Sequence, residues 1–267
     1  MRSTIAESAL STKRLLIGAV ALVAFTGVAM ADAPPSGYLA GHEPDVLAVI
    51  PQPPAPGSPR DEADRAIFRQ TRALEGTPRW ALATADVDPS KLLDDFSCAV
   101  GVTLTKDNSP RLVALLLKVT PDITAAYGVP KDFYKKLRPF TRDTGDICVP
   151  RTEGFAKSYD YPSGHATGSW TIGLILSRAA PDRTGQILDR ARAFGESRVV
   201  CGVHNASAVE AGRLAADTLV SALAADEAFR TDLAAARAEL TALRASGPAP
   251  DPTACKAEAA LTARTPW

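Results

Sequence analysis

Apolar residues recur at helical spacing along most of this chain of 267 residues, and no segment alternates apolar and polar residues as a half-buried strand does. The stretch from 58 to 246 is divided into successive predicted helices by residues typical of helix ends: Ser-Pro pairs and Asp where a helix begins, and Gly where one ends. Each such helix buries its apolar stripe against other helices. The sequence therefore predicts an all-α fold, a single-domain helical bundle without internal repeats.

Helices are expected at 58–76, from 89 to about 100, from 109 with a kink or a new turn at Pro121, and at 163–179, 182–200, 206–224 and 227–245. Residues 128–162 mix prolines, glycines, charges and aromatics without a period. Here we expect a long irregular connection after a short helix at Lys131–Leu137. An irregular segment of this length inside a compact domain is usually functional.

The first 31 residues have the composition of a secretory leader: a positively charged start, an apolar run at 15–28 and a small-x-small cleavage site at 29–31. We expect a signal peptide at 1–31, with an uncleaved anchor as the alternative. A Pro-rich N-terminal arm follows at 32–57, either a flexible linker or a segment laid over the domain. The helical domain is expected at 58–246, and a C-terminal tail at 247–267 that is loose unless Cys255 fixes it.

The charge balance and the cysteine content limit which partners the protein can bind and where in the cell it is expected to be. Lys plus Arg and Asp plus Glu each total 30, so no global field favours a nucleic acid polymer or an anionic membrane. The four cysteines, all after the leader, favour two disulfides in an oxidising compartment, with three connectivities open. Their spacing lacks the paired ligands of a zinc site, and we expect no metal. The predicted location is the periplasm or the outside of the cell.

The segment Pro162-Ser163-Gly164-His165 is a turn that opens a helix. Ser163 is a favoured N-cap residue, and the free N–H groups of a helix N-terminus beside a titratable imidazole form an anion site. Before this turn, Lys131 and Arg138 are spaced to share one helical face, two turns apart. The acids of the preceding loop, including Asp160, are expected to be solvated.

After this turn, Arg198 lies near the end of a predicted helix and precedes His204, one of three histidines in the chain. Guanidinium groups bind phosphate oxygens bidentately. The basic residues, the helix N-terminus and the two histidines together predict a site for one tetrahedral dianion.

Three segments in order resemble the signature of the type-2 phosphatidic acid phosphatase and vanadium haloperoxidase superfamily: Lys131-x6-Arg138-Pro139, Pro162-Ser163-Gly164-His165 and Ser197-Arg198-x5-His204. Within that superfamily the chain is similar to the bacterial class A non-specific acid phosphatases. Further segments that carry this resemblance are Phe96-Ser97-Cys98-Ala99 and Cys201-Gly202-Val203-His204. The resemblance extends over roughly residues 48–215 and implies the helical bundle of that superfamily.

The resemblance implies a metal-independent acid phosphatase that hydrolyses small phosphate monoesters, nucleotides among the candidates, through a phosphohistidine. It implies that His204 is the nucleophile and that His165 is the general acid and then the base. It also implies that the phosphate is bound by Lys131, Arg138, Ser163, Gly164 and Arg198. Because fixed cationic donors can neutralise the transferred phosphoryl group, no cofactor is expected. A homo-oligomer remains a candidate state.

The proposed roles predict an acidic pH optimum. His204 must be neutral to attack phosphorus, whereas His165 must be protonated to donate to the leaving group. A requirement of this kind gives a bell-shaped profile, and an imidazole acid with a pKa of about 6.5 places it at mildly acidic pH.

One position departs from the family pattern. That pattern usually has Asp four residues after the nucleophilic His, where it bonds the far ring nitrogen, and this chain has Ala208 there. Three interpretations remain open. Glu210 reaches the ring by another path, the Ser207 hydroxyl or a backbone carbonyl substitutes for the carboxylate, or the chain is a weakened or inactive anion-binding homologue.

Two other members of the superfamily are alternatives. A vanadium-dependent haloperoxidase would use the same residues to hold vanadate, but such enzymes are generally much longer. A membrane lipid phosphatase needs several apolar spans of about twenty residues, and the sequence after the leader is expected to contain none.

Overall fold

The structure is a computed structural model that describes residues 36–267, which form one compact unit. The predicted signal peptide and the first residues of the arm lie outside the described residues. Within the described part the chain folds into helices and contains no strand, with one isolated antiparallel bridge between Leu137 and Tyr159. The prediction of an all-α fold is confirmed.

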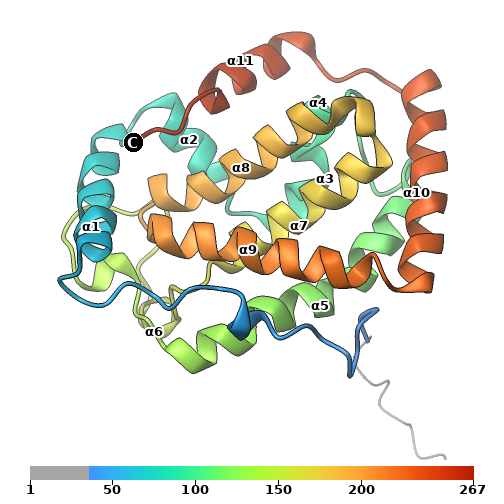
Figure 1. Cartoon of the computed structure of the whole chain (residues 1–267). Coiled ribbons are helices and arrows are strands. Elements are labelled where there is room, and N and C mark those ends of the chain that lie inside the picture. The colour runs from blue at the N-terminus through green and yellow to red at the C-terminus, as the bar shows by residue number, and fades with distance from the viewer. Residues whose placement is uncertain (1–35) are drawn as a thin grey trace, which may run out of the picture. The chain divides into compact units, whose positions relative to one another are not determined.

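The helices follow one another in the order shown in Figure 1: α1 (Pro59–Thr71), α2 (Pro78–Ala85), α3 (Leu92–Asp95), α4 (Ser97–Val100), α5 (Pro110–Tyr134), α6 (Glu153–Lys157), α7 (Gly164–Ala179), α8 (Thr184–Val200), α9 (Ala206–Leu223), α10 (Glu227–Ser246) and α11 (Pro252–Thr262). Short 3₁₀ turns, among them η3 (Pro89–Lys91) and η4 (Pro139–Thr141), connect them. The helices α2 and α6 were not predicted, and α6 lies in the segment expected to be irregular.

Three helices form the centre of the fold and determine where the site lies. Helix α7 packs against both α8 and α9, while α5 and α10 pack against α7 (Figure 1). The close approach of α7 and α8 requires Gly173, because a Cβ there would lie 2.6 Å from the Cβ of Ala191. This packing brings the start of α7, the end of α8 and the turn before α9 together.

Helix α5 differs from the expectation for its second half. Pro121 and Pro130 lie inside one continuous helix, whose apolar face is buried at Leu112, Leu115, Val119, Ile123 and Ala126. The helix ends at Tyr134, and Lys135 follows in a left-handed conformation with φ of 49°. The predicted separate helix at Lys131–Leu137 is therefore wrong, and Arg138 does not share a helical face with Lys131.

By length and composition alone, α5 is also apolar enough to cross a membrane, which differs from the expectation that no such segment follows the leader. The structure accounts for its apolar character in another way, because α5 packs against α7, α9 and α10.

The described part of the N-terminal arm is packed against the helices. Leu39, Val46 and Ile50 are buried in the main core. The carboxylate of Asp122 on α5 accepts hydrogen bonds from the backbone N–H groups of Tyr38 at 2.8 Å and Leu39 at 3.1 Å. Of the two alternatives for this arm, the structure has the segment laid over the domain.

Two disulfides are present, as predicted, and they settle the pairing that the sequence left open. Cys98 is bonded to Cys255, and Cys148 to Cys201. The first fixes α11 to α4, so the tail that was expected to be loose without such a bond contains a helix.

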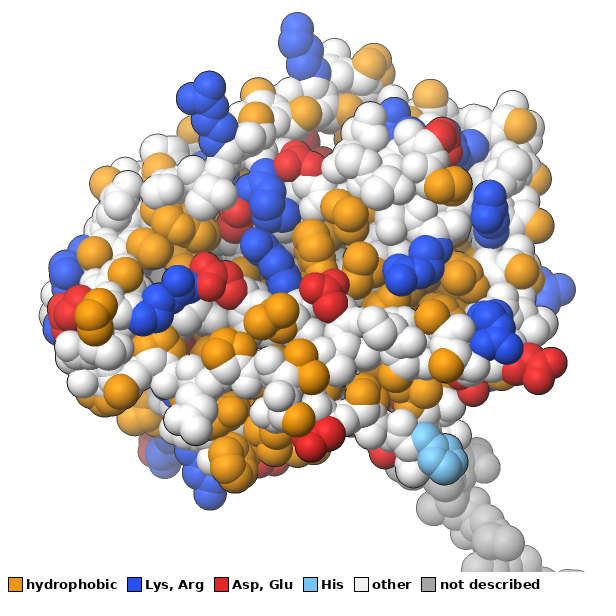
Figure 2. Space-filling model, in the orientation of Figure 1, with side chains coloured by type: hydrophobic (Ala, Val, Ile, Leu, Met, Phe, Trp, Pro, Cys, Tyr) orange, Lys and Arg blue, Asp and Glu red, His pale blue; other side chains and the backbone are white. Residues whose placement is uncertain are grey.

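Charged side chains of both signs are interspersed over the face of the molecule drawn in Figure 2. This distribution agrees with the equal numbers of basic and acidic residues in the sequence.

Candidate active site

A cavity of about 380 Å³ opens where the end of α5, the start of α7 and the turn before α9 meet. It contains both histidines of the sequence signature together with two of its cations. The lining residues are Pro89, Leu92, Tyr127, Lys131, Arg138, Gly164, His165, Gly168, Ser169, Phe194 and His204. The structure thus brings together residues that lie far apart in the sequence.

His204 lies in the turn between α8 and α9, and its ring is bonded at both nitrogens. Nδ1 is 2.8 Å from Oδ1 of Asp160, and Nε2 is 3.1 Å from Nη1 of Arg138. A carboxylate accepts and a guanidinium can only donate, so these partners favour the tautomer with the proton on Nδ1 and the lone pair on Nε2. Burial, and then the charges of Arg138 and Lys131, hold the pKa of His204 well below its usual value. The ring is therefore neutral at pH 7.

His165 is the second residue of α7, next to Gly164. Its Nε2 is 3.4 Å from the backbone carbonyl oxygen of Val87, which can only accept, so Nδ1 is the ring nitrogen left to exchange a proton. Burial and the charge of Arg198 lower the pKa of His165 to about 4. Above that pH His165 is neutral.

Arg138 and Lys131 place positive charge at the cavity wall. The guanidinium of Arg138 donates from Nη1 to the carbonyl of Val203 at 2.8 Å and from Nε to Oγ of Ser158 at 2.8 Å. It also lies over the ring of Phe155, 4.2 Å from the centroid. Nζ of Lys131 donates to the carbonyl of Tyr159 at 2.5 Å. Burial and the nearby Arg138 lower the pKa of Lys131 to about 8.

Arg198, in the last turn of α8, is almost completely buried, and its Nε and Nη1 have no hydrogen-bond partner among the described residues. Its carbonyl accepts from the backbone N–H groups of Val203 at 3.1 Å and His204 at 3.3 Å, which places it near the cavity although it does not line it. Its charge is among the causes that lower the pKa values of both histidines. Buried polar groups are nearly always paired. Two unmet guanidinium donors beside two neutral imidazoles therefore fit an anion.

Ser163 is buried behind the cavity and is not one of its lining residues. As the N-cap of α7, its Oγ accepts from the backbone N–H of Ala166 at 3.3 Å, and its own N–H donates to the carbonyl of Ala208 at 2.9 Å. A Cβ added to Gly164 would lie 3.2 Å from the ring of Tyr127. The absence of a side chain at Gly164 thus keeps the start of α7 close to α5.

The two side chains considered as substitutes for a carboxylate at position 208 do not contact His204. Glu210 is exposed and pairs with Arg60 of α1. Ser207 is bonded to Asp64 of α1, which accepts from its backbone N–H at 3.0 Å and from its hydroxyl. The structure corrects this expectation, because the carboxylate at Nδ1 belongs to Asp160.

Sequence reasoning missed Asp160, which was expected to be a solvated loop acid. Its side chain is completely buried, and its backbone N–H donates to the carbonyl of Lys136 at 2.7 Å. Burial raises the pKa of its carboxyl, against hydrogen bonds from Asn205 that lower it. The available signal was its place two residues before Pro162, but no periodic pattern indicates where a side chain in an irregular segment points.

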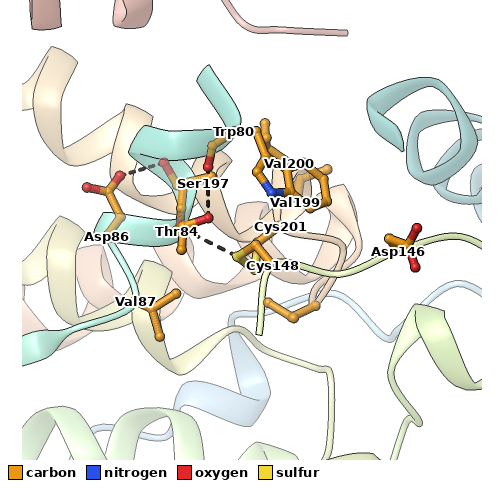
Figure 3. Close-up of a disulfide and its surroundings, with 12 residues drawn as sticks. Trp80, Thr84, Asp86, Val87, Asp146, Cys148, Ser197, Val199, Val200 and Cys201 are labelled. Atoms are coloured by element: carbon orange, nitrogen blue, oxygen red, sulfur yellow. Dashed lines mark hydrogen bonds between the residues drawn. A yellow bond between two sulfur atoms is a disulfide. The ribbon is translucent and has the colours of Figure 1, made fainter. Parts of the chain in front are cut away.

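A disulfide attaches the irregular segment to the turn that carries His204. Figure 3 shows the bond between Cys148 and Cys201 beside the end of α8. The two Cα atoms are 4.8 Å apart, and the backbone N–H of Cys148 donates to the carbonyl of Cys201 at 3.1 Å. Because Cys201 precedes His204 by one short turn, the bond restrains the side of the cavity that His204 lines.

The described residues contain no group of three or more His, Cys, Asp or Glu side chains placed to hold a metal ion. The polar groups around the cavity are mainly cations and N–H donors, a set that suits an anion.

Known proteins are similar to this chain over most of its length. A family model described as the PAP2 superfamily matches residues 112–230. An acid phosphatase of Zymomonas mobilis is 39% identical over 227 residues, which make up 84% of this chain and 86% of that protein. Non-specific acid phosphatases of Salmonella typhi and Providencia stuartii are 34% and 32% identical, over 72% and 75% of this chain and 78% and 82% of their own lengths. The chain therefore belongs to the PAP2 superfamily.

Proposed function

We propose that this protein is an exported acid phosphatase that hydrolyses small phosphate monoesters through a phosphohistidine on His204. The observation that carries the proposal is the cavity in which two neutral imidazoles face buried cations, with two donors of Arg198 left unmet. The names of the relatives support the reaction class. The two disulfides support export to an oxidising compartment.

In the first step, the phosphate group of the substrate accepts hydrogen bonds from Arg198 and from the cations at the cavity wall. Nε2 of His204 attacks phosphorus with its lone pair, and the bond from phosphorus to the ester oxygen breaks. That oxygen leaves with the bonding electrons and takes a proton from Nδ1 of His165. Arg138, Lys131 and Arg198 stabilise the negative charge on the phosphoryl oxygens during transfer.

In the second step, a water molecule attacks the phosphorus of phosphohistidine. His165, now neutral, takes a proton from the water at Nδ1, and the bond between phosphorus and Nε2 breaks. The bonding electrons return to Nε2 as a lone pair. Inorganic phosphate leaves, and the protonated His165 is ready for another ester dianion.

The low pKa of His165 in the empty site places a condition on the first step. A substrate dianion offsets the charge of Arg198 and raises the pKa of His165 when it binds. The monoanion of the substrate can equally carry the required proton into the site. Both routes give the same protonation state, and both favour acidic pH.

The test is hydrolysis of an aryl phosphate at mildly acidic pH in the presence of a chelator, comparing the parent protein with His204→Ala. We expect His204→Ala to lose turnover by several orders of magnitude, because the attacking atom is removed. His42→Ala is the matched control, since His42 is an exposed histidine of the arm and is expected to leave turnover unchanged. A parent protein without turnover would contradict the proposal.

A further inference from the structure

The carboxylate of Asp160 makes all of its described side-chain hydrogen bonds to the turn that carries His204. Oδ1 is 2.8 Å from Nδ1 of His204 and accepts from the backbone N–H of Asn205 at 3.2 Å. Oδ2 accepts from Nδ2 of Asn205 at 2.7 Å. The bonds to His204 and Asn205 fix the carboxylate relative to the imidazole ring and to the backbone of the turn.

We infer that Asp160 is the positioning residue of His204. It holds the proton on Nδ1 and so keeps the lone pair on Nε2, which accepts from Nη1 of Arg138 until phosphorus takes the place of that donor. It also stabilises the positive charge that develops on the ring when Nε2 bonds to phosphorus. This inference rests on the proposed function and adds to it the group that makes His204 nucleophilic.

Helix α9 supplies no carboxylate for this purpose in its first turn. Its first three residues are Ala206, Ser207 and Ala208, and the hydroxyl of Ser207 is bonded to Asp64. Ala208 is completely buried, and its carbonyl accepts the backbone N–H of Ser163. The positioning group therefore comes from the segment just before α7. One stretch, 160–165, carries this carboxylate, the turn at the start of α7 and the general acid.

The comparison of Asp160→Asn with Asp64→Asn tests the inference. Both are buried acids bonded to the turn at 205–207, but Asp64 does not contact the ring. An amide at position 160 can donate to Nδ1 and favour the wrong tautomer. We expect kcat to fall by about 10²–10⁴-fold with KM nearly unchanged, by analogy with the corresponding change in catalytic triads. Asp64→Asn is expected to lower Tm while leaving kcat within about twofold. An Asp160→Asn variant with parent-like kcat would overturn the inference.

Nitrogen-15 NMR of the imidazoles in the parent protein gives a second test that needs no variant to fold. The inference predicts that His204 carries its proton on Nδ1 in the phosphate-free protein, and a proton on Nε2 would overturn it. Because this readout does not require turnover, it stays informative if the aryl phosphate assay shows no activity. A failure of the inference about Asp160 can thus be distinguished from a failure of the proposed function.

A separate observation concerns the substrate. A second cavity, of about 410 Å³, shares Pro89 and Leu92 with the first and extends between α5 and α7. Its lining is almost entirely apolar, with Lys106 as the charged member. The lining residues are Pro89, Ser90, Leu92, Leu93, Phe96, Lys106, Val113, Leu116, Leu117, Thr120, Ile172 and Leu176.

The two cavities follow the same faces of the same two helices. On α7, His165, Gly168, Ile172 and Leu176 succeed one another at intervals of three or four residues. The face of α5 that contributes Tyr127 to the first cavity contributes Thr120 to the second. The apolar cavity therefore begins on the side of His165, toward which the proposed mechanism directs the ester oxygen.

We propose that this cavity receives the apolar organic group of the substrate, an alkyl or aryl group attached to the ester oxygen. The proposal rests on the proposed function, because it uses the position of the general acid. Each methylene that enters an apolar cavity is expected to raise kcat/KM by about three- to fourfold.

The test measures kcat/KM for the series from ethyl to octyl phosphate, with glycerol phosphate as a polar reference. We expect a rise with chain length, and a flattened rise in Leu117→Asp because a charge then lies at the rim of the cavity, where Leu117 is 67% exposed. Leu214→Asp is the matched control, as Leu214 is an exposed leucine of α9 that lines neither cavity. A kcat/KM that is independent of chain length would overturn the proposal. Failure to hydrolyse any member would instead contradict the proposed function.

Discussion

At the scale of single residues, the site depends on where a few protons lie. Burial and the neighbouring cations lower the pKa values of both imidazoles, so both rings are neutral at pH 7. This differs from the expectation that His165 titrates near its ordinary pKa. For the proposed mechanism, we therefore attribute the expected acidic optimum to the protonation state of the substrate rather than to titration of His165 near 6.5.

This difference predicts a specific pH dependence. The pKa of His165 is lowered to about 4, so its neutral form is lost only as the pH falls through that value. The monoanion of a phosphate monoester is lost as the pH rises through about 6. We expect kcat/KM to be highest toward the upper of these values, because burial raises the pKa of the Asp160 carboxyl to about 6 and His204 loses its ionised partner as the pH falls below that value. The alkaline limb is expected to move when esters of different second pKa are compared. An alkaline limb that stays near 6.5 for every ester would assign it to His165 instead.

The shared location of four signature residues was predictable from the sequence, whereas the hydrogen-bond partners of their side chains were not. The order and spacing of the three signature segments placed His165, His204, Lys131 and Arg138 in one site, and the cavity contains them all. The partner of His204 was not predictable, because Asp160 lies in a segment without a period. The family pattern at position 208 drew attention to the nearby Glu210 instead, and that side chain is exposed and pairs with Arg60.

At the scale of structural elements, helix ends determine the site, and the sequence indicated most of them. Ser163 caps α7 as its residue type predicts, and α8 ends just after Arg198. The helix at 131–137 was wrong because packing of the apolar face of α5 carries the helix through two prolines. The packing of α5 against other helices thus outweighed the tendency of its prolines to end a helix.

The two disulfides are expected to differ in their effect on activity. Replacing both Cys148 and Cys201 by Ser should lower the free energy of unfolding by about 2–4 kcal/mol and also lower kcat, because the turn before His204 loses a restraint. Replacing both Cys98 and Cys255 should lower stability with little change in kcat, since α11 lies outside the cavity. Denaturant unfolding and steady-state kinetics on both variants check this, and equal effects on kcat would contradict it.

At the scale of the whole molecule, segments distant in sequence support the same cavity. The arm is packed against α5, and the hydroxyl of Tyr161, next to Asp160, donates to the carbonyl of Pro51 at 2.6 Å. Composition alone could not show whether this Pro-rich arm was a linker or part of the fold, because prolines suit both. The buried apolar residues of the arm decide the question.

The arm makes a prediction about stability. Ile50 is 4% exposed whereas its neighbour Val49 is 51% exposed. Ile50→Ala should lower the free energy of unfolding by about 2–4 kcal/mol through the lost contacts and the cavity left behind. Val49→Ala should change it by less than about 0.5 kcal/mol. Thermal unfolding of the two variants compares them directly, and equal Tm values would mean that the arm does not contribute to the core.

The central claim is that Nε2 of His204 bonds to phosphorus during turnover. Rapid mixing with a phosphorus-32-labelled aryl phosphate, followed by an alkaline quench and peptide mapping, tests it most directly. The account predicts an acid-labile label on the peptide that contains His204, with phosphate on Nε2, and no label in His204→Ala. Steady hydrolysis by the parent without a labelled His204 peptide, or an unchanged label in His204→Ala, would contradict it.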